Sequence, residues 1–411
     1  MNRLAWVVPS LLGLVFAAGS VSVPDPRPAL SEIARIEAEA PGASPAEVEA
    51  RRARILEIAK KAVDGIDAAS VPSDRAHLWG HLFVFADQKE SAVVAYERFL
   101  AVDREPSAKL DVQFALVGLY ASLGRGGPLR RTLLAMEPAT NLEKALLASI
   151  AAVHADLIAD AAGEAEAIAT LEAMDARVAW AAFGSPSDAT VPAEQRQTAE
   201  GYQVTLILAM ADLLVRTGNR DAAIAQLDRG LLALPENSPS RRQLQTRRTQ
   251  LSLIGARAPE LDVERTHGRF GGLRSMRGQV VVVVFFAHWC GPCLQALREL
   301  KVLSEELGPQ GVQFVAATTF YGYFRQENAT NRDMPKDVEF ARVGTLVADL
   351  QAPWPTVFGP RSNFTAYAVS GIPHFAAIDR EGVVRHIQIG FSGRSSARLR
   401  RAVEALARAD N

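Results

Sequence analysis

The stretch VVVVVFFAHWCGPC, residues 280–293, decides the fold of the C-terminal half of the chain. It opens with an uninterrupted apolar run rich in β-branched valines, which is typical of a strand buried on both faces of a parallel sheet. Apolar residues then recur at helical spacing over residues 294–307, and a second apolar run follows Gly311 at residues 312–317. The order strand, cysteine loop, helix and strand indicates a βαβ unit, with the cysteines where the first strand meets the helix.

Cys290 and Cys293 are the only two cysteines in the chain of 411 residues. One such pair excludes a small disulfide-rich scaffold and a four-cysteine zinc ribbon. A disulfide between the two would close a very short loop, so it would add little to the stability of the fold. Disulfide exchange needs one thiolate that attacks and a second thiol that resolves the mixed disulfide. At a helix N-terminus the partial positive charge stabilises the Cys290 thiolate, while Cys293, one turn inside, attacks second.

The sequence around the two cysteines resembles the active site of the thioredoxin superfamily, and in particular the exported TlpA/ResA-like thiol–disulfide oxidoreductases. LRSMRG at residues 273–278 is similar to the segment that those proteins place before their active-site strand, and YAVSGIP at 367–373 is similar to their Tyr-x-Val-x-Gly-x-Pro segment. The resemblance covers about residues 260–408. It implies a thioredoxin-like α/β domain over that range.

The resemblance also implies the site and its chemistry. Pro373 follows a cis peptide bond and faces the cysteines in that family, and we expect Trp289, Ile372 and Pro373 to bind the substrate. The Gly-Pro pair between the cysteines resembles reducing thioredoxins, so we predict a reductase that acts on protein disulfides, with no cofactor. A membrane-bound thiol reductase is the electron donor that the resemblance implies.

Two departures leave the proton acceptor for Cys293 unidentified. Thioredoxins carry a buried Asp where this chain has Val284, and ResA-like proteins carry a Glu where it has Ala296. Glu299 lies on the same predicted helix, but at the wrong offset, so we assign it to the solvated surface.

A third departure is His374, directly after the predicted cis proline. If it lies near Cys290, a protonated His374 would stabilise the thiolate, and His288, two residues before Cys290, could add to that effect. Partly exposed histidines without a role, or a soft-metal site shared with the cysteines, are the alternatives. We predict no metal site.

The N-terminal 23 residues have the pattern of a secretory signal peptide. A single Arg3 precedes a mostly apolar run over residues 4–18, and small residues follow. An uncleaved membrane anchor is the alternative, but the run is short for a span and contains Pro9. We therefore expect export, to the bacterial periplasm, of a chain that is soluble or tethered once.

Residues 31–255 are rich in Ala, Leu, Glu and Arg, and their apolar residues follow helical spacing. The clearest helix pair, over residues 204–234, turns at Gly218 and stops at Pro235, and it resembles a tetratricopeptide-type repeat. The turn points at 87, 124 and 218 are irregularly spaced, so an ordinary irregular helical domain is an equal alternative. By analogy with helical solenoids, we expect this domain to bind a protein.

Composition and charge fit a multidomain globular protein. Apolar types make up 48% of the residues, and the formal net charge is -1, which gives no reason to expect nucleic acid. His77 and His81 have the spacing of one helix face but no evident third ligand, so we predict packing rather than metal binding. The exposed aromatics of residues 321–324 are candidates for the border of the active-site groove.

The predicted architecture is a signal peptide at 1–23, an all-α helical-repeat-like domain at 31–255 and an α/β thioredoxin-like domain at 260–408. Two other functions compete with the oxidoreductase. A non-catalytic metal-binding or scaffold protein could reuse the fold without the acid residues. A peroxidase would need a lone peroxidatic cysteine in a different loop, which the paired motif argues against.

Overall fold

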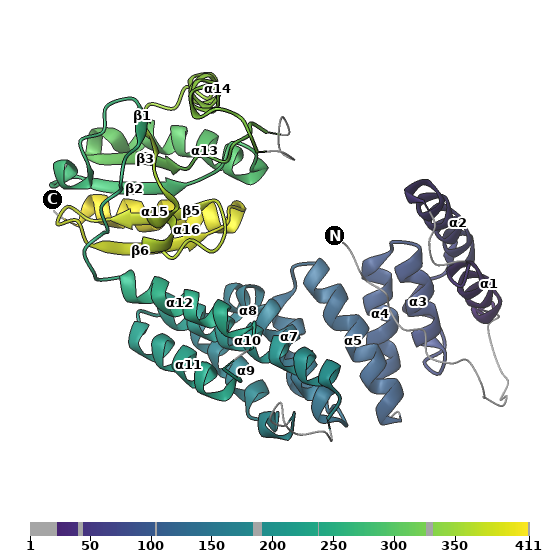
Figure 1. Ribbon diagram of the computed structural model, residues 1–411. Helices are drawn as coiled ribbons and strands as arrows, with labels where there is room; N and C mark the ends of the chain where they lie inside the picture. The colour runs from purple at the N-terminus through teal and green to yellow at the C-terminus, as the bar shows by residue number, and fades with distance from the viewer. Residues whose placement is uncertain are drawn as a thin grey trace. The chain divides into compact units, whose positions relative to one another are not determined.

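The computed structural model describes residues 23–39, 44–102, 105–183, 191–236, 238–325 and 332–409 (Figure 1). Residues 1–22 of the expected signal peptide lie outside these ranges. Residue contacts divide the chain into two compact units, an N-terminal unit Met1–Ala209 and a C-terminal unit Met210–Asn411. The domain boundaries near residues 255 and 260 stay predictions.

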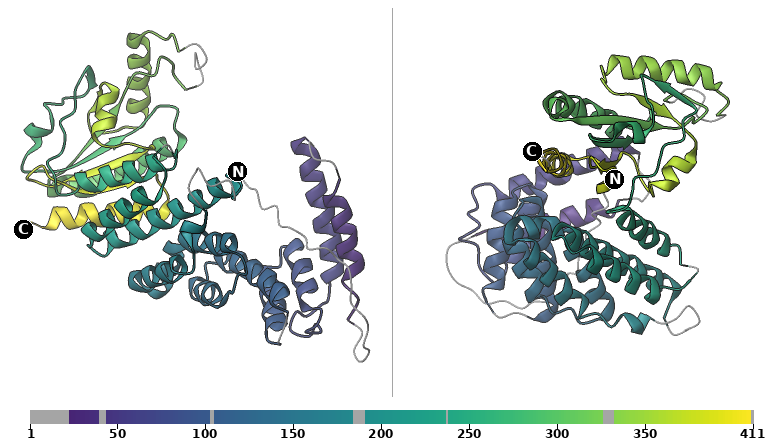
Figure 2. Two further views of the ribbon diagram at one scale, coloured as in Figure 1. Left: turned by 60° about the horizontal axis from the view of Figure 1, so that its bottom comes forward. Right: turned by 90° about the vertical axis from the view of Figure 1, so that its left-hand side faces the viewer.

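In the described residues of the N-terminal unit every regular element is a helix, which confirms the predicted all-α region (Figure 2). Its helices are α1 (Arg27–Glu37), α2 (Pro45–Val63), α3 (Ala76–Phe85), α4 (Lys89–Leu100), α5 (Pro106–Ser122), α6 (Gly126–Ala135), α7 (Asn141–Val153), α8 (Ala155–Ala162), α9 (Glu164–Asp175) and a 3-10 turn Trp180–Phe183. The long α10 (Ala193–Arg216) crosses into the C-terminal unit.

The turn points that the sequence suggested have left-handed backbone. Asp87, Gly124 and Gly218 have φ of 59°, 70° and 80°, and each follows the end of a helix. Short turns of this kind connect α3 to α4, α5 to α6, and α10 to α11 (Arg220–Ala233). The identity of these pairs as tetratricopeptide repeats stays a prediction.

The histidines of α3 are packing residues. His81 Nδ1 shares a hydrogen bond of 2.8 Å with the Tyr96 hydroxyl of α4, and the His77 ring lies 4.5 Å from the Phe99 ring, between centroids. Both contacts join α3 to α4, as the sequence led us to expect.

In the described part of the chain, one helix, Ala193–Arg216, is long and apolar enough to span a membrane by length and composition. The bent pair Asn141–Val153 and Ala155–Ala162 meets the same criterion if it is taken as one segment. Buried helices of soluble proteins meet it as well.

The C-terminal unit contains α11, α12 (Arg241–Leu253) and a mixed six-stranded sheet with its helices. The elements are β1 (Arg265–His267), β2 (Val280–Phe285), α13 (Gly291–Leu307), β3 (Val312–Thr318), α14 (Lys336–Asp349), β4 (Thr356–Phe358), α15 (Arg361–Ala366), β5 (His374–Ile378), β6 (Val384–Ile389) and α16 (Gly393–Arg408). Short 3-10 turns lie at Leu273–Met276 and Gly308–Gln310.

The strands are arranged in the order β1-β4-β3-β2-β5-β6. Strand β2 is parallel to β3 and antiparallel to β5, and β5 pairs with β6 in the predicted closing hairpin. All residues of β2 are buried, because helices and loops cover both faces of the sheet. The predicted βαβ unit β2–α13–β3 is confirmed.

Two apolar cores lie on the two faces of this sheet. Leu297 of α13, Val343 of α14 and Leu399 of α16 belong to the core on one face, together with both cysteines. Leu273 and Tyr367 belong to the core on the other face. Alternate residues of β2 therefore point to different helices, and the cysteines share the face of α13.

Candidate active site

The two cysteines form a disulfide at the start of α13. Cys290 is the residue that caps the helix, and its Sγ accepts a hydrogen bond of 3.2 Å from the backbone N–H of Cys293. The residue Cys290 is 7% exposed and Cys293 is fully buried, so Cys290 is the more accessible residue of the pair. When the pair is reduced, the unpaired N–H groups of the helix N-terminus favour a thiolate at Cys290.

The peptide bond between Ile372 and Pro373 is cis, as the resemblance implied. The carbonyl oxygen of Ile372 lies 3.7 Å from Cys290 Sγ, and β5 begins directly after Pro373. The antiparallel pairing of β5 with β2 brings this segment to the end of β2, where the cysteines follow. Trp289, the residue before Cys290, is 43% exposed, and the roles of Trp289, Ile372 and Pro373 in substrate binding stay predictions.

His374 does not lie with the cysteines. Its neighbour Phe375 belongs to the core under α13, and the alternation of β5 places His374 on the opposite face, where its ring lies 5.8 Å from Phe285. His374 is fully buried, and this burial lowers the pKa of its imidazole to about 4, with the charge of Arg247 acting in the same direction. The expectation that a protonated His374 stabilises the Cys290 thiolate is therefore corrected.

His288 is buried, not partly exposed, and only its Nδ1 has a hydrogen-bond partner among the described residues. Nδ1 accepts a hydrogen bond of 3.0 Å from the backbone N–H of Arg325, and Nε2 lies 3.5 Å from Glu339 Oε1. The ring stacks on Phe324 with centroids 5.2 Å apart. Nδ1 and Nε2 thus face Arg325 and Glu339. With His374 on the opposite face, the two histidines and the cysteines do not assemble into the metal site considered above.

Glu339 is a residue of this region that the sequence did not indicate. Its carboxylate is fully buried and accepts hydrogen bonds from the backbone N–H groups of Tyr321, at 2.8 Å, and Gly322, at 2.9 Å. Tyr321 in turn meets the Trp289 ring edge-on at 5.7 Å. Glu339 and His288 thus hold the aromatic loop at residues 321–324 against the segment that leads to Cys290. An acidic residue in the first turn of a helix is common, so the sequence carried no signal for this role.

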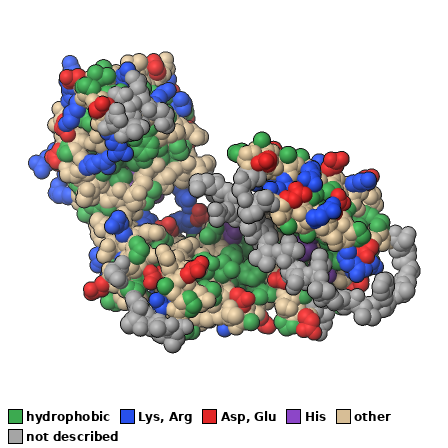
Figure 3. All heavy atoms as spheres, turned by 45° about the vertical axis from the view of Figure 1, so that its right-hand side comes forward, with side chains coloured by type: hydrophobic (Ala, Val, Ile, Leu, Met, Phe, Trp, Pro, Cys, Tyr) green, Lys and Arg blue, Asp and Glu red, His purple; other side chains and the backbone are tan. Residues whose placement is uncertain are grey.

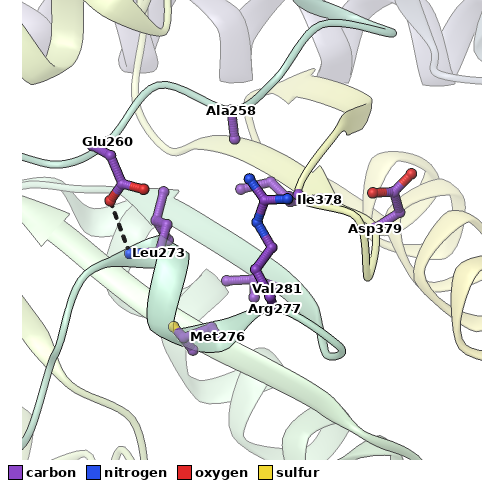
Figure 4. A pocket seen from close by; sticks show the side chains of 9 residues that line it. Ala258, Glu260, Leu273, Met276, Arg277, Val281, Ile378 and Asp379 are labelled. Atoms are coloured by element: carbon purple, nitrogen blue, oxygen red, sulfur yellow. Dashed lines mark hydrogen bonds between the residues drawn. The ribbon is translucent and has the colours of Figure 1, made fainter.

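A pocket of about 290 Å³, including space open to solvent, lies elsewhere in the C-terminal unit (Figure 4). Ala258, Glu260, Val281 and Asp379 are among the residues that line it, and Glu260 accepts a hydrogen bond of 3.1 Å from Leu273 N–H. Val281 is near the beginning of β2, whereas the cysteines follow its end. The cysteines therefore do not line this pocket.

Residues 254–405 match the Redoxin family. Thioredoxin-like protein YneN of Bacillus subtilis (strain 168) is 22% identical over 136 residues, which are 33% of this chain and 71% of that protein. A structure provisionally named thiol:disulfide interchange protein DsbE, from Chlorobium tepidum, is 25% identical, with 38% of this chain and 97% of that one covered and a TM-score of 0.31. A thiol-disulfide isomerase from Corynebacterium glutamicum is 19% identical, with 37% and 97% covered and a TM-score of 0.29.

The Redoxin match, the sheet topology and the disulfide at the head of α13 concern the same part of the chain. The helical region before it is not covered by the Redoxin match. Residues 254–405 are therefore a Redoxin domain, and this part of the chain belongs to the thioredoxin superfamily of thiol–disulfide oxidoreductases.

Proposed function

We propose that this protein is exported and reduces disulfide bonds of other proteins through Cys290 and Cys293. The observation that carries the proposal is the asymmetry of the pair: Cys290 is 7% exposed beside the Ile372 carbonyl, and Cys293 is fully buried within the first turn of α13. On this proposal, Cys290 Sγ is the sulfur that reacts with the substrate disulfide. Cys293 Sγ then resolves the mixed disulfide from inside the protein.

The exchange proceeds in two displacements. The Cys290 thiolate attacks one sulfur of the substrate, the substrate S–S bond breaks, and one substrate thiolate leaves. Cys293, once deprotonated, attacks Cys290 Sγ in the mixed disulfide, and the second substrate thiolate leaves as the Cys290–Cys293 disulfide forms. The substrate gains two electrons and the protein loses two, so an external dithiol must return the pair to the reduced state.

The reducing direction is supported by the residues between the cysteines. Gly291 and Pro292 resemble the dipeptide of reducing thioredoxins, whose potential is about -270 mV, against about -120 mV for the oxidant DsbA. The imidazole that would have favoured an oxidising pair, His374, faces away and is neutral near pH 7, which agrees with this direction. A membrane-bound thiol reductase is the proposed electron donor, and the helical region is proposed to bind a protein, in the manner of tetratricopeptide repeats.

Trapping of the mixed disulfide tests the proposal. The Cys293→Ala variant, reduced and then mixed with a disulfide-containing protein such as insulin, should accumulate a covalent adduct that dithiothreitol releases. The matched Cys290→Ala variant should form none. If insulin reduction survives in the Cys290→Ala variant, the reaction does not pass through Cys290. If no adduct forms with Cys293→Ala and the wild type does not reduce insulin, the protein is a non-catalytic member of its fold.

The proposed export has its own measurement. Expression of the full chain in a Gram-negative host should deliver the protein to the periplasm, with an intact mass that lacks the first 18 to 23 residues, the apolar run and its small-residue tail. An intact mass that includes Met1 or Asn2 in a membrane fraction would support the uncleaved anchor instead. Recovery from the cytoplasm at full length would contradict export.

A further inference from the structure

Helix α12 ends before the Redoxin match begins, and the residues that follow it are hydrogen-bonded to the sheet of the C-terminal unit. Directly after the helix, Gly255 N–H donates to the Val384 carbonyl at 2.8 Å, and Val384 N–H donates to the Ala256 carbonyl at 2.9 Å. Leu253 and Ile254 pack against the core that contains Phe285. The helix therefore has a fixed position relative to β6 and to the segment that carries Pro373.

Gln250 of α12 reaches that segment. Its side-chain Nε2 donates one hydrogen bond of 2.8 Å to the carbonyl oxygen of Ala368 and another, of 3.3 Å, to Ser370 Oγ. Gln250 is 1% exposed, so these bonds are made away from solvent. They connect positions that are 118 and 120 residues apart in the chain.

Arg247 fixes the orientation of the Gln250 amide. Its Nη1 donates to Gln250 Oε1 at 3.3 Å, which leaves Nε2 to face Ala368. The guanidinium is itself held by Asp212 of α10, with Nη2 at 2.7 Å and Nε at 2.8 Å from Asp212 Oδ1. A continuous polar chain thus runs from α10 through α12 to the segment before Pro373.

The segment that Gln250 holds has few other restraints. Ala368 has a φ of 50°, which turns the chain out of α15, and Val369 N–H still donates to Phe364 O at 2.8 Å. In the parts of the chain that the structure describes, no backbone hydrogen bond reaches Ser370, Gly371 or Ile372. The next one is at Pro373, whose carbonyl accepts from Gly390 N–H at 2.8 Å. Gln250 therefore adds polar contacts to Ala368 and Ser370, on either side of Val369.

We propose that Gln250 is a positioning residue for substrate binding. Among the described residues the N–H and carbonyl groups of Ile372 have no backbone partner, and the carbonyl oxygen lies 3.7 Å from Cys290 Sγ, so they are available to an extended substrate chain. A backbone held in its bound geometry loses less conformational freedom on binding, and Gln250 gives the segment that restraint. The proposal rests on the proposed exchange with protein disulfides, and it makes a helix outside the Redoxin match part of the substrate site.

The test compares two disulfides in single-turnover reactions of the reduced full-length protein. One is a peptide with an internal disulfide, which offers backbone N–H and C=O groups, and the other is hydroxyethyl disulfide, which offers none. In Gln250→Met, which keeps the size of the side chain but removes its donors, the ratio of the second-order rate constants, peptide over hydroxyethyl disulfide, should fall about tenfold. Gln250→Glu, which also removes the donors, should lower the same ratio.

Gln245→Met is the matched control, because Gln245 is exposed on the same helix, and its ratio should equal that of the wild type. If Gln250→Met and Gln250→Glu lower the rate constants for the peptide and for hydroxyethyl disulfide equally, or lower neither, the positioning role is wrong. A general disturbance of the site would not slow the peptide reaction selectively. If the wild-type protein reduces neither disulfide, the proposed function fails and not this inference. Gln250→Glu keeps the acceptor for Arg247, so the comparison survives if Gln250→Met unfolds.

Discussion

His374 is buried with no hydrogen-bond partner on either ring nitrogen among the described residues, and its pKa falls from 6.5 to about 4. Between these values the unfolded chain binds a proton that the folded chain does not, so stability rises with pH. The contribution of His374 is therefore complete above about pH 6.5 and is lost as the pH falls toward 4.

This titration predicts a pH-dependent difference between the wild type and His374→Leu. The free energy of unfolding of the wild type should fall, relative to the variant, by about 2 kcal/mol between pH 7 and pH 5, because only the wild type has an imidazole to protonate. Urea unfolding of both proteins at each pH measures the difference. A difference that is the same at pH 7 and pH 5 would mean that His374 has the same pKa in the folded and the unfolded chain.

Glu339 makes a second prediction at the scale of one residue. Glu339→Gln replaces one carboxylate oxygen by an amide NH₂, so either Tyr321 N–H or Gly322 N–H loses its buried acceptor. The free energy of unfolding should drop by roughly 1–3 kcal/mol, measured by urea unfolding. Asp337→Asn is the control, because the Asp337 side chain is 84% exposed on the same helix, and it should change stability by less than about 0.5 kcal/mol. Equal effects of the two variants would be evidence against the buried anchor.

At the scale of elements, close helix contacts depend on glycine. A Cβ built on Gly126 at the start of α6 would lie 2.1 Å from the backbone oxygen of Leu157 in α8, too close for the two helices to keep their distance. Gly127, the next residue, would place its Cβ 3.7 Å from a flexible Arg131 side chain and meet nothing else. The two neighbouring glycines therefore have different structural roles.

Gly126→Ala should destabilise the N-terminal unit by about 1–3 kcal/mol, whereas Gly127→Ala should be neutral or stabilise it by up to about 1 kcal/mol. Thermal unfolding of the full chain followed by circular dichroism compares the two variants under the same conditions. The packing argument for α6 and α8 is wrong if Gly126→Ala unfolds at the temperature of the wild type.

At the scale of the molecule, the C-terminal unit is larger than the Redoxin match. Contacts group residues 210–411 together, and the matched region begins at residue 254, after α12.

Acidic and basic side chains are interspersed over the described surface on the face shown in Figure 3, which agrees with the net charge of -1.

The larger extent of the C-terminal unit, compared with the Redoxin match, predicts how two fragments of the chain behave. A fragment of residues 254–411 lacks α12, so the Ala368 carbonyl loses its donor and the apolar surface around Leu253 is uncovered. It should be less stable than a fragment of residues 238–411 by at least about 2 kcal/mol. Urea unfolding of both fragments gives the comparison. Equal midpoints and slopes would mean that α12 adds nothing to the folding of the Redoxin domain.

The sequence predicted what depends on neighbouring residues. The buried valine run, the cysteine pair and the amphipathic spacing after it specified β2, the start of α13 and the chemistry of the dithiol, since each signal lies within a few residues of the structure that it indicates. The cis bond at Pro373 was expected from a longer resemblance and is present. Glu339 and Gln250 could not be predicted, because their partners lie far away in the chain and ordinary helix positions give no sign of them.

The placement of His374 shows where local reasoning fails. Its position next to Pro373 was clear from the sequence, but strand alternation directs its ring to the face opposite the cysteines, and only the register of β5 on β2 decides which face that is. Sequence alone thus determined the reacting sulfurs, the strand and helix that hold them and the helical character of the first half. The tertiary structure decided which side chains surround those sulfurs, because burial and contact between distant segments arise only when the sheet and its helices pack together.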